Sequence, residues 1–98
     1  MSTKSQFIII YRPPRATFLD DQTEAESEVI GQHFQYLQQL LHEGKLIMAG
    51  RCIDAAFGIA IIEAASESEA QQIMENDPAV QAKVFSSELR PFSTALRR

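Results

Sequence analysis

The sequence has little of what marks several large classes of proteins. Its one cysteine, Cys52, cannot form a disulfide within the chain, which fits a reducing compartment. Basic residues are outnumbered, with 9 Lys and Arg against 13 Asp and Glu and a net charge of −4. Because the basic residues are also scattered, the chain lacks the positive patch of a general nucleic-acid binder. No apolar run approaches the roughly 18–20 residues that cross a bilayer, and the run at residues 7–10 is too short for a signal peptide. We therefore expect a cytoplasmic protein that binds neither nucleic acid nor membrane.

Motifs for cofactors, metals and covalent catalysis are also missing. The four glycines are dispersed along the chain, so there is no glycine-rich phosphate loop. Cys52 and the two histidines, His33 and His42, lack the short paired spacings of zinc sites. No G-x-S-x-G nucleophile turn occurs. We expect neither a cofactor nor a bound metal.

What remains is the pattern of one globular domain, residues 1–98, with 45% hydrophobic residues. Short β-branched and apolar runs predict strands, and two capping-box spacings, Thr23 with Glu26 and Ser66 with Glu69, predict helix starts. We expect strands at residues 6–11, 45–52, 57–64 and 83–90, helices at 23–44 and 66–76, a polar loop at 12–22, one further turn at 79–82, and Pro91 as the end of the last strand.

This order, β-α-β-β-α-β, predicts an α+β ferredoxin-like fold in which two helices cover one face of a four-stranded antiparallel sheet. The first and third strands are apolar on both faces, and a bare second face would expose more apolar surface than monomers usually tolerate. We therefore expect a homodimer in which two subunits pack sheet against sheet. The long helix carries an apolar stripe that consists of Val29, Ile30, Phe34, Leu37, Leu40 and Leu41. Three later aromatic residues are expected in the core rather than as a platform for a substrate: Phe57, Phe85 and Phe92.

His33 is the first candidate for chemistry. It lies four residues from both Val29 and Leu37, in the middle of the apolar stripe, whereas His42 projects to the opposite, solvent side. A histidine in such a place is either a core residue satisfied by one hydrogen bond or a general acid and base that works near neutral pH.

Asp77 and Tyr36 share the neighbourhood of His33 in two different ways. Asp77 precedes a proline, where it either ends a helix and starts a turn or supplies a carboxylate that orients the His33 ring and fixes its tautomer. Tyr36 follows His33 by three residues, and its hydroxyl either donates into a pocket or wedges the helix against the sheet.

Two arginines complete the candidate residues. Arg12 and Arg51 each end a strand, where they either bind an anionic substrate or are ordinary solvated charges.

Four motifs in order resemble the YCII-related (YciI-like) domain family: His33-Phe-Gln-Tyr36-Leu37, Glu43-Gly44-Lys-Leu-Ile-Met-Ala-Gly50, Asn76-Asp77-Pro78, and Arg90-Pro91-Phe92. The resemblance implies a dimeric α/β-barrel of two ferredoxin-like subunits, and a His–Asp dyad that falls on His33 and Asp77. It also implies small-molecule chemistry, because a few relatives are described as enzymes that remove chloride from chlorinated hydroxyquinones. Arg51 replaces the proline that many members carry after the second-strand glycine, and residues 12–28 are longer and more polar than in the shortest members.

Three functions follow as hypotheses. The first is a cofactor-independent enzyme in which His33, oriented by Asp77, performs acid–base chemistry of the isomerisation or elimination type on a small molecule bound by Tyr36, Arg12 or Arg51. The alternatives are a non-catalytic module that binds a small ligand in the same pocket, and a structural dimer whose histidine is only packed.

Overall fold

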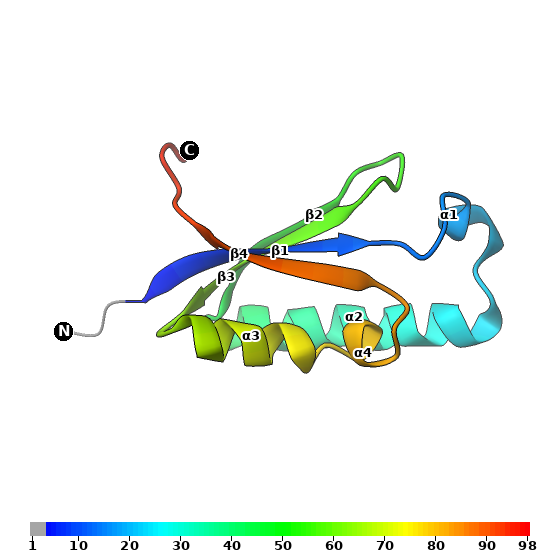
Figure 1. Cartoon of the computed structure of the whole chain (residues 1–98), viewed down its shortest axis with the longest axis horizontal. Coiled ribbons are helices and arrows are strands. Elements are labelled where there is room, and N and C mark those ends of the chain that lie inside the picture. The colour runs from blue at the N-terminus through cyan, green and yellow to red at the C-terminus, as the bar shows by residue number, and fades with distance from the viewer. Residues whose placement is uncertain (1–3) are drawn as a thin grey trace.

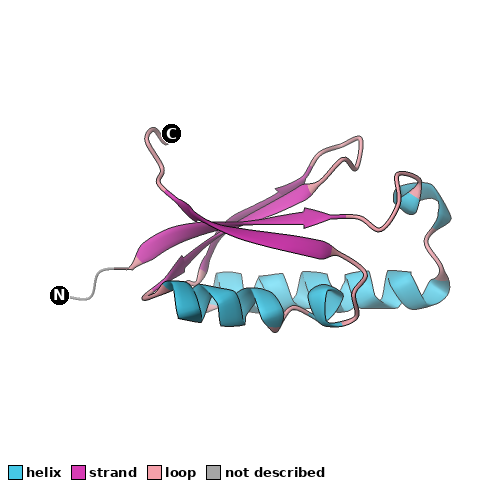
Figure 2. Cartoon of the chain, viewed as in Figure 1, coloured by secondary structure: helices cyan, strands magenta, loops and turns pink. Residues whose placement is uncertain are grey.

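Four strands and four helices follow one another along residues 4–98, the part of the chain that this computed structural model describes. The strands are β1 (Ser5–Arg12), β2 (Leu46–Arg51), β3 (Gly58–Ala64) and β4 (Ser86–Phe92), and the helices are α1 (Phe18–Asp21), α2 (Glu24–His42), α3 (Glu67–Glu75) and α4 (Pro78–Gln81). The strands form one antiparallel sheet in the order β2-β3-β1-β4. Helices α2, α3 and α4 lie on one face of it (Figures 1 and 2). The predicted α+β architecture is confirmed in its four-stranded antiparallel sheet and its two longer helices on one face.

The core fills the space between the sheet and these helices. β1 alternates between its two faces, so that Phe7, Ile9 and Tyr11 are buried on the helix side, while Ile8 and Ile10 point to the other face. On the neighbouring strand Ile62 pairs with Phe7 and is fully buried. The helices contribute Leu37 and Leu40 from α2 and Ala70, Ile73 and Met74 from α3. Tyr11 ends the row of buried residues on β1, and this position is where the core meets the candidate site.

The long helix begins as its sequence predicts. The hydroxyl of Thr23 accepts a hydrogen bond from the backbone N–H of Glu26, and the carboxylate of Glu26 accepts one from the backbone N–H of Thr23, so both halves of the capping box are present. At the other end Gly44 has a φ of +77°, the left-handed conformation expected just beyond a helix C-terminus.

The loop predicted for residues 12–22 contains a short helix, α1. One turn forms here because Phe18 is almost completely buried, and Thr17 accepts hydrogen bonds from the backbone N–H groups of Asp20 and Asp21. Because the segment is mostly polar, its composition did not indicate that one buried aromatic side chain would hold a short helix here.

The last strand lies three residues later at its start than predicted, and it does not end at Pro91. Residues 83–85 close α4 instead, since the carbonyl of Ala79 accepts hydrogen bonds from the backbone N–H groups of Val84 and Phe85. Pro91 continues the strand and pairs with Phe7. A proline is tolerated there because β4 is an edge strand, whose outer side needs no ladder donors.

The apolar stripe of α2 is only partly buried, contrary to the prediction. Phe34 is 61% exposed and Leu41 56% exposed, whereas Leu37 and Leu40 are in the core. The α3 and α4 regions contact α2 through His33 and Tyr36, whereas Phe34 and Leu41 lie outside these contacts. The predicted core positions of Phe57 and Phe92 are also wrong, because these side chains are 43% and 40% exposed.

Candidate active site

His33 and Asp77 meet beside the sheet, although 44 residues separate them in the sequence. Nδ1 of His33 lies 2.8 Å from Oδ1 and 2.7 Å from Oδ2 of Asp77. The Asp77 side chain is 0% exposed and that of His33 is 13% exposed. A short contact of this kind, shielded from water, holds the imidazole in one orientation.

Local sequence explains why the carboxylate of Asp77 is fixed in position. Asp77 is the N-cap of α4, and its Oδ1 accepts a hydrogen bond of 2.9 Å from the backbone N–H of Ala79. The following Pro78 is the first residue of this helix and restricts Asp77 to the extended conformation that an N-cap requires. Asp77 therefore starts a turn, and the same carboxylate also contacts the imidazole of His33.

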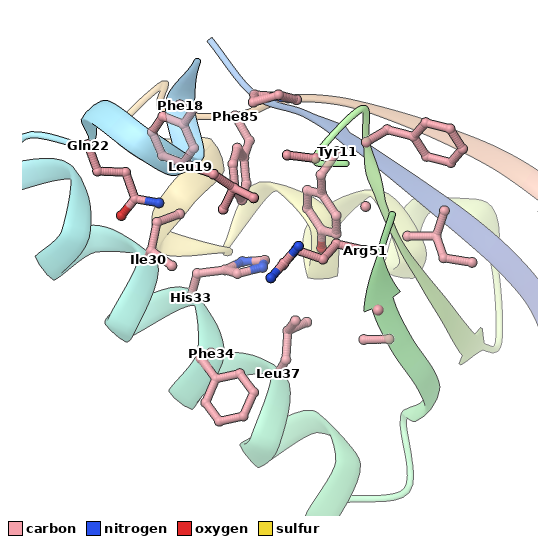
Figure 3. A pocket seen from close by; sticks show the side chains of 17 residues that line it. Tyr11, Phe18, Leu19, Gln22, Ile30, His33, Phe34, Leu37, Arg51 and Phe85 are labelled. Carbon is pink, nitrogen blue, oxygen red and sulfur yellow. The ribbon is translucent and has the colours of Figure 1, made fainter. Parts of the chain in front are cut away.

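The tautomer of His33 follows from its partner. An ionised carboxylate can only accept, so Nδ1 of the neutral imidazole carries the proton and donates it to Asp77. The lone pair of Nε2 is then free, and the imidazole points into a cavity (Figure 3). This is the arrangement in which an imidazole can remove a proton from a bound molecule.

Aromatic rings pack around the imidazole from three segments of the chain. Tyr11 at the end of β1 stacks edge-on, with ring centroids 5.1 Å apart and planes at 80°. Phe85, just before β4, does the same at 5.4 Å and 87°. Phe18 of α1 packs against Phe85 at 5.9 Å. The rings restrict the rotation of the imidazole and make its surroundings apolar.

The cavity beside His33 has a volume of about 320 Å³. Side chains from α1, α2, β1 and the β2–β3 hairpin line it, and most of them are apolar: Phe18, Leu19, Ile30, Phe34, Leu37, Phe57, Ile59 and Phe85. A cavity of this size and composition suits a small, largely apolar molecule. The polar side chains among its lining residues are few, and they include Gln22, His33 and Arg51.

Arg51 supplies a positive charge to this cavity. Its side chain extends toward His33 in Figure 3, and Nη1 donates to the backbone carbonyls of Cys52 and Ile53 at 3.3 and 3.4 Å. Among the arginines of the described strands, Arg12 and Arg90 form ion pairs with Glu88, whereas Arg51 has no carboxylate partner. Its guanidinium is thus available to an anionic group of a bound molecule.

Tyr36 and Arg12, the other two candidates, do not line the cavity. The hydroxyl of Tyr36 donates to the carbonyl of Ile73 at 2.8 Å and so joins α2 to α3. Burial and the nearby charge of Asp77 raise the pKa of Tyr36 to about 12. The Arg12 side chain is 53% exposed and lies 3.2 Å from Glu88. The structure brings His33, Asp77 and Arg51 to one place but leaves Tyr36 and Arg12 outside it.

Tyr11 belongs to the site, and the sequence analysis did not single it out. It is only 4% exposed and it lines the cavity. Burial raises the pKa of Tyr11 well above its usual range, and the nearby charge of Asp77 raises it further. The alternation of β1 was the available signal, because it places Tyr11 on the same face as the core residues.

Arg15 fixes the wall of the cavity that α1 provides. Its guanidinium donates to Oδ1 of Asp21 at 2.8 Å and to both carboxylate oxygens of Glu26 at 2.9 and 2.7 Å. It also lies 5.4 Å from the ring centroid of Phe18. The hydrogen bond from Arg15, with a further one from the backbone of Thr23, lowers the pKa of Glu26 to about 2.

Residues 4–98 contain neither a metal-binding cluster nor a membrane-spanning helix. No cluster of three or more His, Cys, Asp or Glu side chains is placed to hold a metal ion. None of the described helices combines the length and the apolar character needed to cross a membrane.

These features describe a small α+β domain with a buried carboxylate–imidazole pair at an apolar cavity. The chain belongs to the YCII-related domain family, whose model matches residues 6–93. Among solved structures it is similar to 5-chloro-2-hydroxyhydroquinone dehydrochlorinase (TftG) from Burkholderia phenoliruptrix AC1100 in complex with 2,5-dihydroxybenzoquinone. The TM-score is 0.64 at 24% identity, and the match covers 89% of this chain and 93% of the other, which supports the fold. No curated protein matches the chain.

Proposed function

We propose that this protein is a cofactor-independent enzyme that uses His33 and Asp77 for general acid–base chemistry on a small molecule bound in the cavity. The observation that carries the proposal is the 2.7 Å contact between a fully buried carboxylate and an imidazole that lines the cavity. A histidine needed only for packing requires neither a charged partner nor a neighbouring cavity.

The reaction type follows from the groups that surround the cavity. Its lining contains a base but no cysteine, serine or lysine that could act as a nucleophile. Proton transfer is the chemistry that remains, in isomerisation or in elimination. In elimination, Nε2 of His33 removes a proton, the electron pair left behind forms a new double bond, and the leaving group departs with its bonding pair. The similar solved structure is that of a dehydrochlorinase, an enzyme of the elimination type.

Arg51 is the residue we propose for binding the polar end of the substrate. Its unpaired guanidinium lines the same cavity as His33. A substrate that becomes more negative as it loses its proton would be stabilised by this charge, and the apolar rings would hold the rest of the molecule. The chemistry therefore favours an apolar ring with an acidic oxygen.

A chloride-release assay tests the proposal, with 5-chloro-2-hydroxyhydroquinone as the first probe and 2,5-dihydroxybenzoquinone as a binding probe. We expect turnover that falls at least ~100-fold in His33→Ala, the range typical of a lost general base. The matched control is His42→Ala, since His42 is the chain's other histidine and lies on the surface. A probe that binds but is recovered unchanged would favour a non-catalytic binding module, and full activity in His33→Ala would remove the dyad from the mechanism.

We also propose that the protein is a homodimer whose subunits pack through the sheet face opposite the helices. This face carries Ile8 and Ile10 of β1, together with Met48 of β2 and Phe92 of β4, by strand register. Met48 is 50% exposed and Phe92 is 40% exposed in the single chain. By the same register Arg90 and Glu88 lie on this face beside Ile8 and Ile10, and the apolar side chains among them are expected to be covered in solution.

A further inference from the structure

The buried carboxylate of Asp77 needs more hydrogen-bond donors than His33 alone. An ionised carboxylate has two oxygens and about four acceptor positions, and a charge removed from water is costly unless those positions are used. Two donors are the imidazole Nδ1 of His33 and the backbone N–H of Ala79. The side chain of Asp77 is completely buried, so bulk water does not supply the rest.

Tyr11 is placed to provide another donor. It ends the buried row of β1, and its ring packs edge-on against the His33 imidazole at 5.1 Å. A second ring contact, at 5.9 Å, joins it to Phe85, which also packs against the His33 imidazole. Its side chain stands beside that of His33 in the cavity (Figure 3). Because His33 in turn lies 2.7 Å from Asp77, the phenol, the imidazole and the carboxylate form one group.

We infer that Tyr11 is a positioning residue of the His33–Asp77 pair: its hydroxyl donates to the Asp77 carboxylate, and its ring holds the plane of the imidazole. The kinetic consequence rests on the proposed function, whereas the structural claim does not. Tyr11 acts through Asp77, so it need not touch the substrate.

The ionisation of Tyr11 agrees with this role. Burial raises the pKa of Tyr11 far above its usual range, and the nearby charge of Asp77 acts in the same direction. The hydroxyl therefore keeps its proton throughout the neutral range. A neutral phenol beside a carboxylate can only serve as the donor.

The other tyrosine of the chain provides a matched control. Tyr36 also lies close enough to feel the charge of Asp77, but its hydroxyl donates to the carbonyl of Ile73 at 2.8 Å. It does not line the cavity. Tyr11→Phe and Tyr36→Phe thus remove the same atom, the phenolic oxygen, at two positions near Asp77, and only the first should affect His33.

The test combines ¹⁵N NMR of the His33 ring with steady-state kinetics in the chloride-release assay. In Tyr11→Phe, where the ring contacts remain, we expect a reduced population of the Nδ1–H tautomer and a kcat lowered about 10-fold, as for one lost hydrogen bond to a charged group, with KM within twofold. Tyr36→Phe should match the unmodified protein in both. An unchanged His33 spectrum in Tyr11→Phe would overturn the inference, and so would a raised KM at unchanged kcat, which would indicate substrate contact instead.

The NMR measurement needs no substrate, so it separates this inference from the proposed function. If no probe is turned over by the unmodified protein, the proposed function fails while the His33 spectrum still decides the role of Tyr11. If Tyr11→Phe does not fold, the ¹³C resonance of Tyr11 Cζ can be followed in Asp77→Asn instead. A shift of that resonance would support the hydrogen bond, and no shift would refute it.

Discussion

Asp77 accepts hydrogen bonds from two different parts of the chain, the imidazole of His33 and the backbone N–H of Ala79. The contact with His33 belongs to the proposed catalytic pair, and the contact with Ala79 caps the start of α4. A substitution that removes the carboxylate would disturb both contacts. The effect on His33 and the effect on α4 can be separated by comparing one variant that keeps a side-chain oxygen at position 77 with one that does not.

The pair Asp77→Asn and Asp77→Ala separates them. The asparagine oxygen can still cap α4, whereas its amide N–H group can only donate to Nδ1 of His33, which must then give up its proton. We expect both variants to lose turnover, and the alanine variant to be less stable than the asparagine variant by about 1 kcal/mol, the usual contribution of an N-cap. Urea unfolding measures the difference, and equal free energies of unfolding would show that Asp77 does not support α4.

At the same scale, Arg51 offers a second test. We expect Arg51→Gln to weaken binding of an anionic probe such as 2,5-dihydroxybenzoquinone about 10-fold, as for one lost charge-assisted hydrogen bond. The stability should hardly change, because the guanidinium forms only long hydrogen bonds of 3.3 and 3.4 Å with its own loop. Isothermal titration calorimetry measures the affinity, with Arg12→Gln as the control outside the cavity. Equal affinities for the two variants would exclude Arg51 from binding.

The sequence predicts some residues of this site and not others, for physical reasons that differ by residue. His33 was placed by helical periodicity, and its pairing with Asp77 came with the family resemblance. Arg12 and Arg51 looked equivalent as strand-end charges, but strand alternation turns Arg51 into the cavity and leaves Arg12 beside Glu88 on the other face. The alternation of β1 places Tyr11 on the core face, but its position beside His33 depends on how α2 packs over the end of that strand.

At the scale of elements, the wall formed by α1 depends on one cluster of charges. Arg15 connects the segment before α1 to Asp21 at the end of that helix and to Glu26 in the first turn of α2. Arg15 of this cluster packs against the ring of Phe18, which lines the cavity together with Leu19. Its loss should therefore loosen the wall before it affects the sheet.

The pH dependence of the Arg15–Glu26 contact is testable through Glu26→Gln. The pKa of Glu26 is lowered from its ordinary 4.5 to about 2 in the folded protein. A lowered folded-state pKa means that the contact stabilises the fold fully above about pH 4.5, and that this contribution is lost as the pH falls toward 2. We expect the melting temperature of Glu26→Gln to lie below that of the unmodified protein at pH 7 and the gap to close on acidification. Glu24→Gln, in the same helical turn but without the arginine contact, is the control, and a gap independent of pH would contradict the account.

The elements themselves were largely predictable because their signals are local. The capping box at Thr23 is decided by neighbouring residues, and its prediction is confirmed. The start of β4 was not predictable in this way. It depends on how α4 closes against residues 83–85, and the tolerance for Pro91 depends on the strand lying at the sheet edge.

For the whole molecule, the proposed homodimer can be tested by a charge placed on the outer face of the sheet. Ile8 pairs with Arg90 on the outer sheet face, so a lysine at position 8 would replace apolar contact area by a second positive charge, which opposes close packing of two subunits. We expect Ile8→Lys to be a monomer at micromolar concentration and the unmodified chain to be a dimer, as measured by light scattering. Leu41→Lys is the matched control, because Leu41 is 56% exposed on α2 and lies away from that face. An unmodified protein that is monomeric would refute sheet-to-sheet packing.

The central claim is that Asp77 holds His33 as the Nδ1–H tautomer, with Nε2 free in the cavity. The most direct test is the ¹⁵N spectrum of the two imidazoles at a pH where the rings are neutral, with surface His42 as the internal reference. The account predicts the Nδ1–H tautomer for His33, opposite to the tautomer that a solvated imidazole favours, and its loss in Asp77→Asn. A His33 ring protonated at Nε2, or one that is unaffected by Asp77→Asn, would contradict the account.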